Sequence, residues 1–180
     1  MAEDIDVAQA AEARPAPAPA LDPLQMRDDE GQLRHGFVAE IARAIHAADR
    51  PLLCEVVAEL HEADLGDLIA ALEPDDRVTL VELTGTDFDF SALNEVDDAV
   101  REEILEELEP ETVAEGVREL ESDDAVELLE GLDEQDKEEI LDKLPPDERA
   151  PLERSLLYPE NSAGRRMQSE FIAVPPDWTV

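Results

Sequence analysis

The strongest constraint on the fold is a twelve-residue period that runs from Asp49 to Leu156. When these residues are written in blocks of twelve, the ninth and twelfth positions are aliphatic throughout, except at Thr84 and Glu153. The eighth position is also mostly apolar, and several blocks add an apolar residue at the fifth. Positions 5, 8, 9 and 12 form an i, i+3, i+4, i+7 set, which is the apolar stripe of an amphipathic helix. Each block therefore predicts one helical stripe.

One long continuous helix does not fit this period. Because an α-helix turns by about 100° per residue, each block would rotate its stripe by roughly 120° relative to the previous block. Pro51, Pro74, Pro110 and Pro146 fall at the second or third place of their blocks, where a first-turn proline loses no hydrogen bond. Each block is thus expected to begin a new short helix, and such helices are unstable alone. They predict an all-α superhelical solenoid of stacked, armadillo-like helices.

Composition changes at both ends of the repeats. Residues 1–33 contain Ala-Pro alternation and are expected to form a flexible arm. Residues 34–157 are expected to form the helical repeat domain. Residues 158–180 read as a linker followed by the first, strand-like element of an incomplete domain, Phe171–Val174, which suggests that the sequence is cut.

A turn-rich insertion interrupts the third and fourth blocks at residues 84–88. Phe88 ends this insertion and Phe90 follows it, and both rings are expected to pack across the joint between two halves of the stack.

The formal charge of −35 excludes several kinds of partner. Nucleic acid and anionic membrane surfaces are disfavoured, because both require a basic face. No apolar run approaches the roughly 20 residues that cross a bilayer, so this segment is expected not to insert into a membrane. The single cysteine, Cys54, has no partner for an intramolecular disulfide, which favours a reducing, cytoplasmic setting. Cations and basic protein surfaces remain as partners.

Catalytic motifs are not found in the sequence. His35, His46 and His61 lack paired ligand spacing. No serine or cysteine shows an arrangement with histidine and acid, and no glycine-rich phosphate loop is present. The chain is predicted not to be an enzyme.

Three stretches resemble the N-terminal cytosolic domain of the MgtE family of magnesium transporters and channels. They are Leu60–Leu68 (LHEADLGDL), Leu120–Asp124 (LESDD) and, above all, Tyr158–Met167 (YPENSAGRRM). The last resembles the family's junction between its helical domain and its paired CBS domains, and Phe171–Val180 resembles the first CBS strand. The resemblance covers roughly residues 36 to 180, while the rest of the CBS pair and the membrane domain are absent from this sequence.

The resemblance implies a regulatory function. In this family the acidic helical domain and the CBS domains bind Mg²⁺ between their carboxylate surfaces, and bound ions hold the cytosolic part compact so that the pore closes. Mg²⁺ is the cofactor that the resemblance implies. The implied partners are the CBS domains and membrane domain of the same full-length protein, which is expected to be a homodimer.

Carried over residue by residue, the resemblance places the metal-binding acids at Asp123 and Glu127, with Asp124 beside them. Asp123 and Glu127 are i and i+4 neighbours and therefore share a helix face. A purely structural interpretation competes with this one, because Ser122 is a natural N-cap and acids in a first turn stabilise a helix dipole. An earlier acidic position of the family falls on Ser91, so that site is either missing or shifted to Asp89.

Two other functions compete with Mg²⁺ sensing. One is a protein-interaction scaffold that resembles the armadillo-like middle domain of flagellar motor switch proteins and grips a basic or helical partner. The other is a simple acidic ion buffer with many equivalent weak sites.

Overall fold

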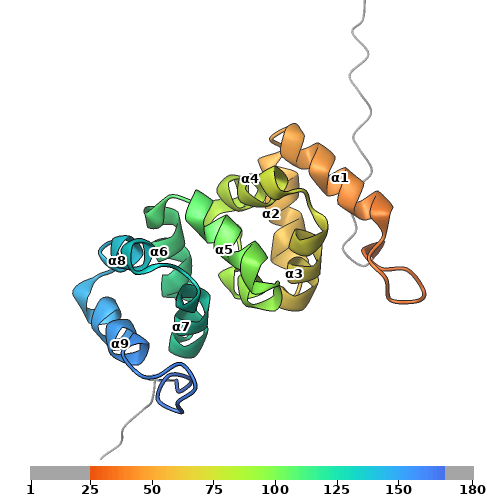
Figure 1. The fold of residues 1–180 in the computed structure, drawn as a ribbon. Coiled ribbons are helices and arrows are strands. Elements are labelled where there is room, and N and C mark those ends of the chain that lie inside the picture. Colours follow the sequence, from red (N-terminus) through yellow and green to blue (C-terminus); the bar gives the residue numbers. More distant parts are fainter. Residues whose placement is uncertain (1–24, 169–180) are drawn as a thin grey trace, which may run out of the picture.

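The computed structural model describes residues 25–168. This part of the chain contains helices and no strand, which confirms the predicted all-α class (Figure 1). One α-helix occupies each twelve-residue block except the fourth, which holds two 3-10 helices, and a further helix precedes the blocks. The elements are α1 (His35–His46), α2 (Arg50–Glu59), α3 (Glu62–Ala71), α4 (Pro74–Thr84), the 3-10 helices η2 (Gly85–Asp87) and η3 (Phe90–Glu95), α5 (Asp98–Glu107), α6 (Pro110–Glu119), α7 (Ser122–Glu130), α8 (Glu134–Leu141) and α9 (Pro146–Leu156).

Helix starts follow the sequence signals. A proline lies in the first turn of α2, α4, α6 and α9, as the block positions predicted. At α8 a side chain caps the start instead: the Asp133 carboxylate accepts hydrogen bonds from the backbone N–H groups of Gln135 (2.8 Å) and Asp136 (3.0 Å).

The fourth block departs from the predicted α-helix. Gly85 ends α4 with a positive φ of 58°, a conformation that favours glycine. The chain then forms the two short 3-10 helices η2 and η3. Six residues of 3-10 structure still bury the eighth and ninth positions of the block, Ala92 and Leu93. The apolar columns are therefore satisfied without an α-helix.

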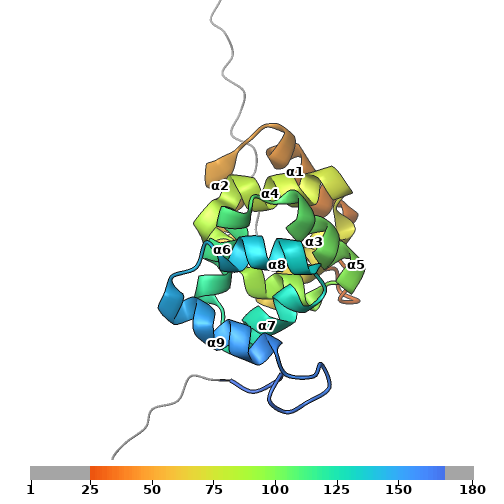
Figure 2. The same ribbon diagram turned by 60° about the vertical axis from the view of Figure 1, so that its left-hand side comes forward.

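Stacking occurs mainly between elements that belong to blocks two positions apart in chain order. α2 packs on α4, α3 on η3, α6 on α8, and α7 on α9. The chain thus winds as a superhelix with two elements in each turn, as Figures 1 and 2 show from two sides. η3 also contacts α6 and α7, so the fourth block joins the earlier helices to the later ones.

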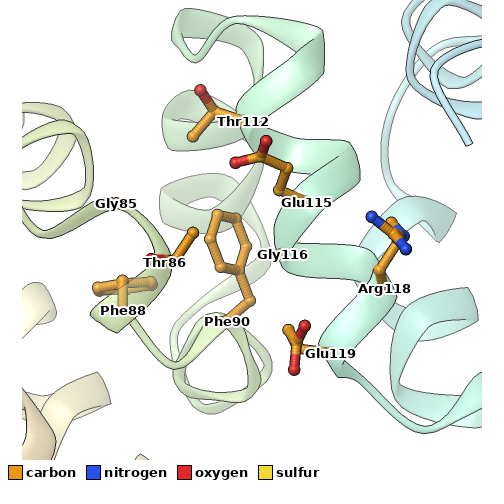
Figure 3. A pocket seen from close by; sticks show the side chains of 9 residues that line it. All are labelled: Gly85, Thr86, Phe88, Phe90, Thr112, Glu115, Gly116, Arg118 and Glu119. Carbon is orange, nitrogen blue, oxygen red and sulfur yellow. The ribbon is translucent and has the colours of Figure 1, made fainter.

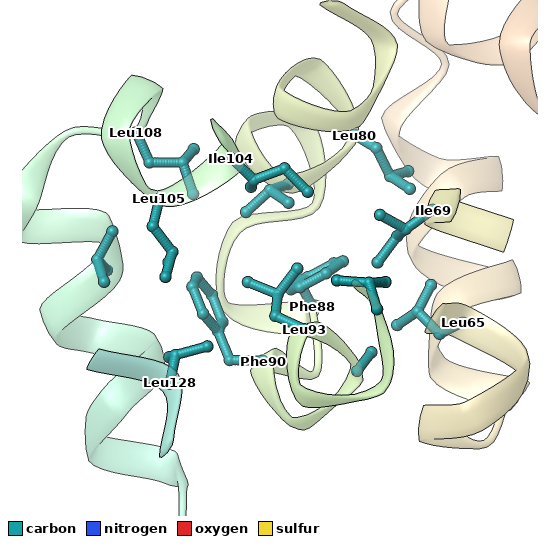
Figure 4. Close-up of a cluster of buried hydrophobic side chains, with 14 of the residues drawn as sticks. Leu65, Ile69, Leu80, Phe88, Phe90, Leu93, Ile104, Leu105, Leu108 and Leu128 are labelled. Carbon is teal, nitrogen blue, oxygen red and sulfur yellow. The ribbon is translucent and has the colours of Figure 1, made fainter. Parts of the chain in front are cut away.

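A continuous apolar core runs through the stack from Met26 to Leu152. Phe88 and Phe90 lie near its middle, with ring centroids 5.3 Å apart in an edge-to-face arrangement. Figure 4 shows the two rings among leucines and isoleucines contributed by both parts of the stack. Phe90 also lies against Gly116 of α6. The predicted position of these rings at the joint is confirmed.

The arm was predicted to extend to residue 33, but residues 25–33 pack against the helical domain. Met26 is only 2% exposed and belongs to the core. Arg27 forms an isolated β-bridge with Leu33, and its guanidinium donates to the carboxylates of Asp64 (2.9 Å) and Asp67 (2.6 Å). Residues 25–33 therefore belong to the folded domain because they bury a methionine and carry an ion-paired arginine. The remaining part of the predicted arm and the strand-like run Phe171–Val174 lie outside the described residues.

None of the helices within residues 25–168 combines the length and the apolar character needed to span a lipid bilayer.

A candidate cation site at the start of α7

The start of α7 places several acids on a short stretch of backbone. Asp123 and Asp124 lie in the first turn, and Glu121 occupies the N-cap position with extended backbone. Ser122 was predicted to be the N-cap of this helix. In the structure it is already the first helical residue, and it is 5% exposed. Ser122 is buried together with the apolar face of α7, whereas Asp123 and Asp124 are half-buried and Glu121 is exposed at the rim.

Three carboxylates gather at this rim. Oxygen atoms of Glu121, Asp123 and Asp124 all lie within 4.8 Å of one another. Partial burial raises the pKa of the Asp124 carboxyl, and the negative charges of Asp123, Glu121, Glu127 and Glu62 raise it further. The group is therefore electrostatically unfavourable when it is fully ionised, and a cation would relieve this repulsion.

One carboxylate oxygen of Asp123, a residue of this cluster, lacks a hydrogen-bond donor in the described part of the chain. Oδ1 of Asp123 is buried and has no hydrogen-bond partner within residues 25–168. A buried carboxylate oxygen is normally paired, because an unsatisfied charged acceptor is costly. This oxygen is suited to a water molecule or to a metal ion.

Glu127 is positioned differently from the sequence-based prediction. Its carboxylate pairs with the guanidinium of Arg166 at 3.2 Å, and Arg166 also pairs with Glu130 at 3.1 Å. The structure brings Glu121, instead of Glu127, together with Asp123 and Asp124. Sequence reasoning favoured the i, i+4 pair and passed over Glu121. The sequence does place Glu121 immediately before the helix, at the N-cap position. From there its carboxylate reaches the acids of the first helical turn.

The three carboxylates of this cluster are suitable ligands for Mg²⁺ in its hydrated form. Mg²⁺ prefers oxygen ligands at about 2.1 Å, so two opposite ligands are about 4.2 Å apart. A set of oxygens that spans up to 4.8 Å suits an ion that keeps part of its water. The N-terminal end of a helix carries a partial positive charge, which weakens cation binding there. We therefore expect an open, weak site that a second surface can complete.

Asn94 connects this site to the middle of the stack. Its side-chain Nδ2 donates to the backbone carbonyl of Asp124 at 3.2 Å. Because Asn94 belongs to η3, the fourth block holds the first turn of α7 in place.

Asp89, the alternative position for an earlier family site, serves as a cap. Its carboxylate accepts from the backbone N–H of Ser91 (3.0 Å) and from the Ser91 hydroxyl (2.6 Å). Asp89 therefore starts η3, and these contacts account for both residues structurally.

A separate cavity of about 230 Å³ lies between the fourth block and α6. Figure 3 shows its lining, which combines the edges of Phe88 and Phe90 with Thr86, Thr112, Glu115, Arg118 and Glu119. Its two threonine hydroxyls have no histidine or cysteine beside them among the lining residues. This cavity contains no nucleophile paired with a base.

The fold and the site together define an acidic all-α repeat domain with a carboxylate cluster at the rim of one helix. A family model described as the MgtE intracellular N domain matches residues 60–161, which is more than half of the chain, and the chain belongs to this family. The resemblance found in the sequence is thereby confirmed. This family is a transporter domain family and is not a family of enzymes.

A solved structure described as the soluble part of a magnesium transporter is similar to this chain, with a TM-score of 0.61 and 24% sequence identity. The match covers 75% of this chain and 54% of the other, so this chain spans about half the length of that protein. The likeness supports the superhelical fold. No match was found among curated proteins.

Proposed function

We propose that this chain is a Mg²⁺-sensing regulatory domain of a magnesium transporter, acting on the cytosolic side of the cell membrane. The observation that carries the proposal is the group of Glu121, Asp123 and Asp124, with its unpaired buried oxygen on Asp123. Family membership supplies the setting, since the domain is named for the transporter family. Membership also favours this function over a flagellar-type scaffold.

The proposed mechanism is cation-mediated attraction between acidic surfaces. Two surfaces that both carry carboxylates repel each other, and a divalent ion placed between them converts the repulsion into attraction. The second surface is proposed to be the CBS domains of the same full-length protein, within a homodimer. Bound Mg²⁺ would hold these parts together and favour a closed pore, while the N domain contributes the α7 carboxylates.

Titration with Mg²⁺ at constant ionic strength tests the proposal. Amide chemical shifts of the 180-residue chain, followed by NMR, should report binding at the start of α7. Two unit charges 4 Å apart in water interact by about 1 kcal/mol, so removing one carboxylate beside a divalent ion should cost about 2 kcal/mol. Asp123→Asn is therefore expected to weaken Mg²⁺ binding by roughly tenfold or more.

Glu138→Gln is a suitable control, because Glu138 is an exposed acid on α8 with no ion pair among the described residues. The control should bind Mg²⁺ nearly as well as the wild type. Equal weakening by both variants would indicate diffuse ion binding, and the proposed site would be wrong.

A further inference from the structure

The segment that follows α9 folds back over α7. This strap comprises residues 157–168, and it is anchored by Arg165, which is 6% exposed. Arg165 donates through Nη1 to the backbone carbonyls of Leu156 and Tyr158, and its Nε lies 3.6 Å from the Glu130 carboxylate. Gly164 lies against Tyr158, since a Cβ at Gly164 would come within 2.9 Å of the ring. The strap thus has a defined position on the domain.

The end of the strap contacts the acids at the candidate site. Gln168 Nε2 donates to the carboxylate of Glu121, which belongs to the cluster. Arg166 pairs with Glu127 and Glu130 on the same helix. The Arg166–Glu127 contact spans 39 residues of sequence and the Gln168–Glu121 contact spans 47. The strap therefore supplies a positive charge and a hydrogen-bond donor to the surface where a cation would bind.

We infer that the strap is a built-in competitor for the cation, and that Mg²⁺ binding at α7 releases it. This inference rests on the proposed function and concerns the regulation of the same site. A cation that recruits Glu121 must compete with Gln168, and it is repelled by the charge of Arg166. The side chain of Arg166 is 50% exposed, and exposed ion pairs are weak enough to be displaced by an ion.

Linkage makes this competition reciprocal. If docking of the strap weakens ion binding, ion binding weakens docking of the strap by the same factor. Occupancy of the site would therefore alter how residues 165–168 are held against α7. The strap would thus transmit the ionic state of α7 along the backbone.

Affinity for Mg²⁺ provides the first test. Arg166→Gln should tighten binding by about threefold to tenfold, because the competing charge is removed. Arg118→Gln is the matched control: Arg118 pairs with Glu148, and its side chain is 47% exposed, close to the value for Arg166. The control also removes one positive charge, yet it should change affinity by less than about twofold. Arg166→Lys keeps the charge and should stay near the wild type.

Trypsin cleavage after Arg166 provides the second test. Mg²⁺ should accelerate this cleavage in the wild type, since release of the strap frees the backbone around Arg166 to enter the protease active site, and the acceleration should be lost in Asp123→Asn/Asp124→Asn. If Arg166→Gln and Arg118→Gln change affinity equally, or Mg²⁺ leaves the cleavage rate unchanged, the inference is overturned while the proposed site stands. If the double variant binds Mg²⁺ as well as the wild type, the proposed function itself fails.

Discussion

Asp124 shows how a single residue at the start of α7 differs from an ordinary surface acid. Many acids of this chain lie on exposed faces of short helices and interact mainly with solvent. Asp124 is partly buried beside Asp123, and both effects raise its pKa. Glu111 illustrates the opposite case, because a hydrogen bond from Lys143 lowers its pKa. The position of each carboxylate relative to other charges therefore decides whether its pKa is raised or lowered in the folded protein.

The pH dependence of stability should separate these two acids. A raised pKa in the folded state means that Asp124 favours folding below its unfolded pKa of about 3.8, and that this contribution is lost as pH rises through the folded value. Asp124→Asn should therefore increase the free energy of unfolding at pH 7 by up to about 0.5 kcal/mol, with the gain vanishing near pH 3. Glu111→Gln should do the reverse, losing stability at pH 7 and matching the wild type in acid. Urea denaturation at both pH values measures this, and a gain for Asp124→Asn that persists in acid would contradict it.

At the scale of elements, the contact between η3 and α6 is one of those that join the two parts of the stack. Phe90 lies so close to Gly116 that an added Cβ would come within 2.3 Å of the ring. The glycine therefore allows a 3-10 helix and an α-helix to approach each other closely. The fourth block packs against α6 although it is not α-helical, because the ring of Phe90 fills the space beside α6.

Replacement of Gly116 by alanine should disturb this contact. The added methyl group must displace the Phe90 ring in a packed core, and overpacking of this kind costs about 1–3 kcal/mol. Gly36→Ala is the matched control, since Gly36 lies in α1 and a Cβ added there would meet nothing within 4 Å. That substitution should be neutral or stabilise by up to about 1 kcal/mol through helix propensity. Chemical denaturation gives both values, and equal stabilities would show that Phe90 can move aside freely.

The whole molecule carries 49 acidic residues against 14 basic ones. Such an excess destabilises the compact state through self-repulsion. The ion pairs in the described part of the chain neutralise only a fraction of the acids, and most of these pairs are exposed. Cations in the surrounding solution must therefore contribute to the stability of the domain.

Added monovalent salt should stabilise the domain. The screening length falls from about 30 Å at 0.01 M to about 3 Å at 1 M, so long-range repulsion between carboxylates is suppressed. We expect NaCl at about 0.5 M to raise Tm by at least about 3 °C relative to about 10 mM, which corresponds to about 1 kcal/mol for a domain of this size. Calorimetry would measure the shift. A Tm that does not respond to NaCl would mean that the charges interact too weakly to matter.

The apolar columns of the repeat determined the buried face of each block, and the first-turn prolines determined where α2, α4, α6 and α9 begin. These features depend on neighbours three or four residues apart, so they can be read locally. Only the tertiary structure decided that Met26 joins the core, that Glu121 meets Asp123 and Asp124, and that Glu127 turns to Arg166. The last pairing joins residues 39 positions apart, and it exists because the chain returns over α7 after α9. The periodicity within a helix carries no information about which later segment will pack against it. The ion-pair partner of a long charged side chain on the surface depends on that segment, so it is decided only by the tertiary structure.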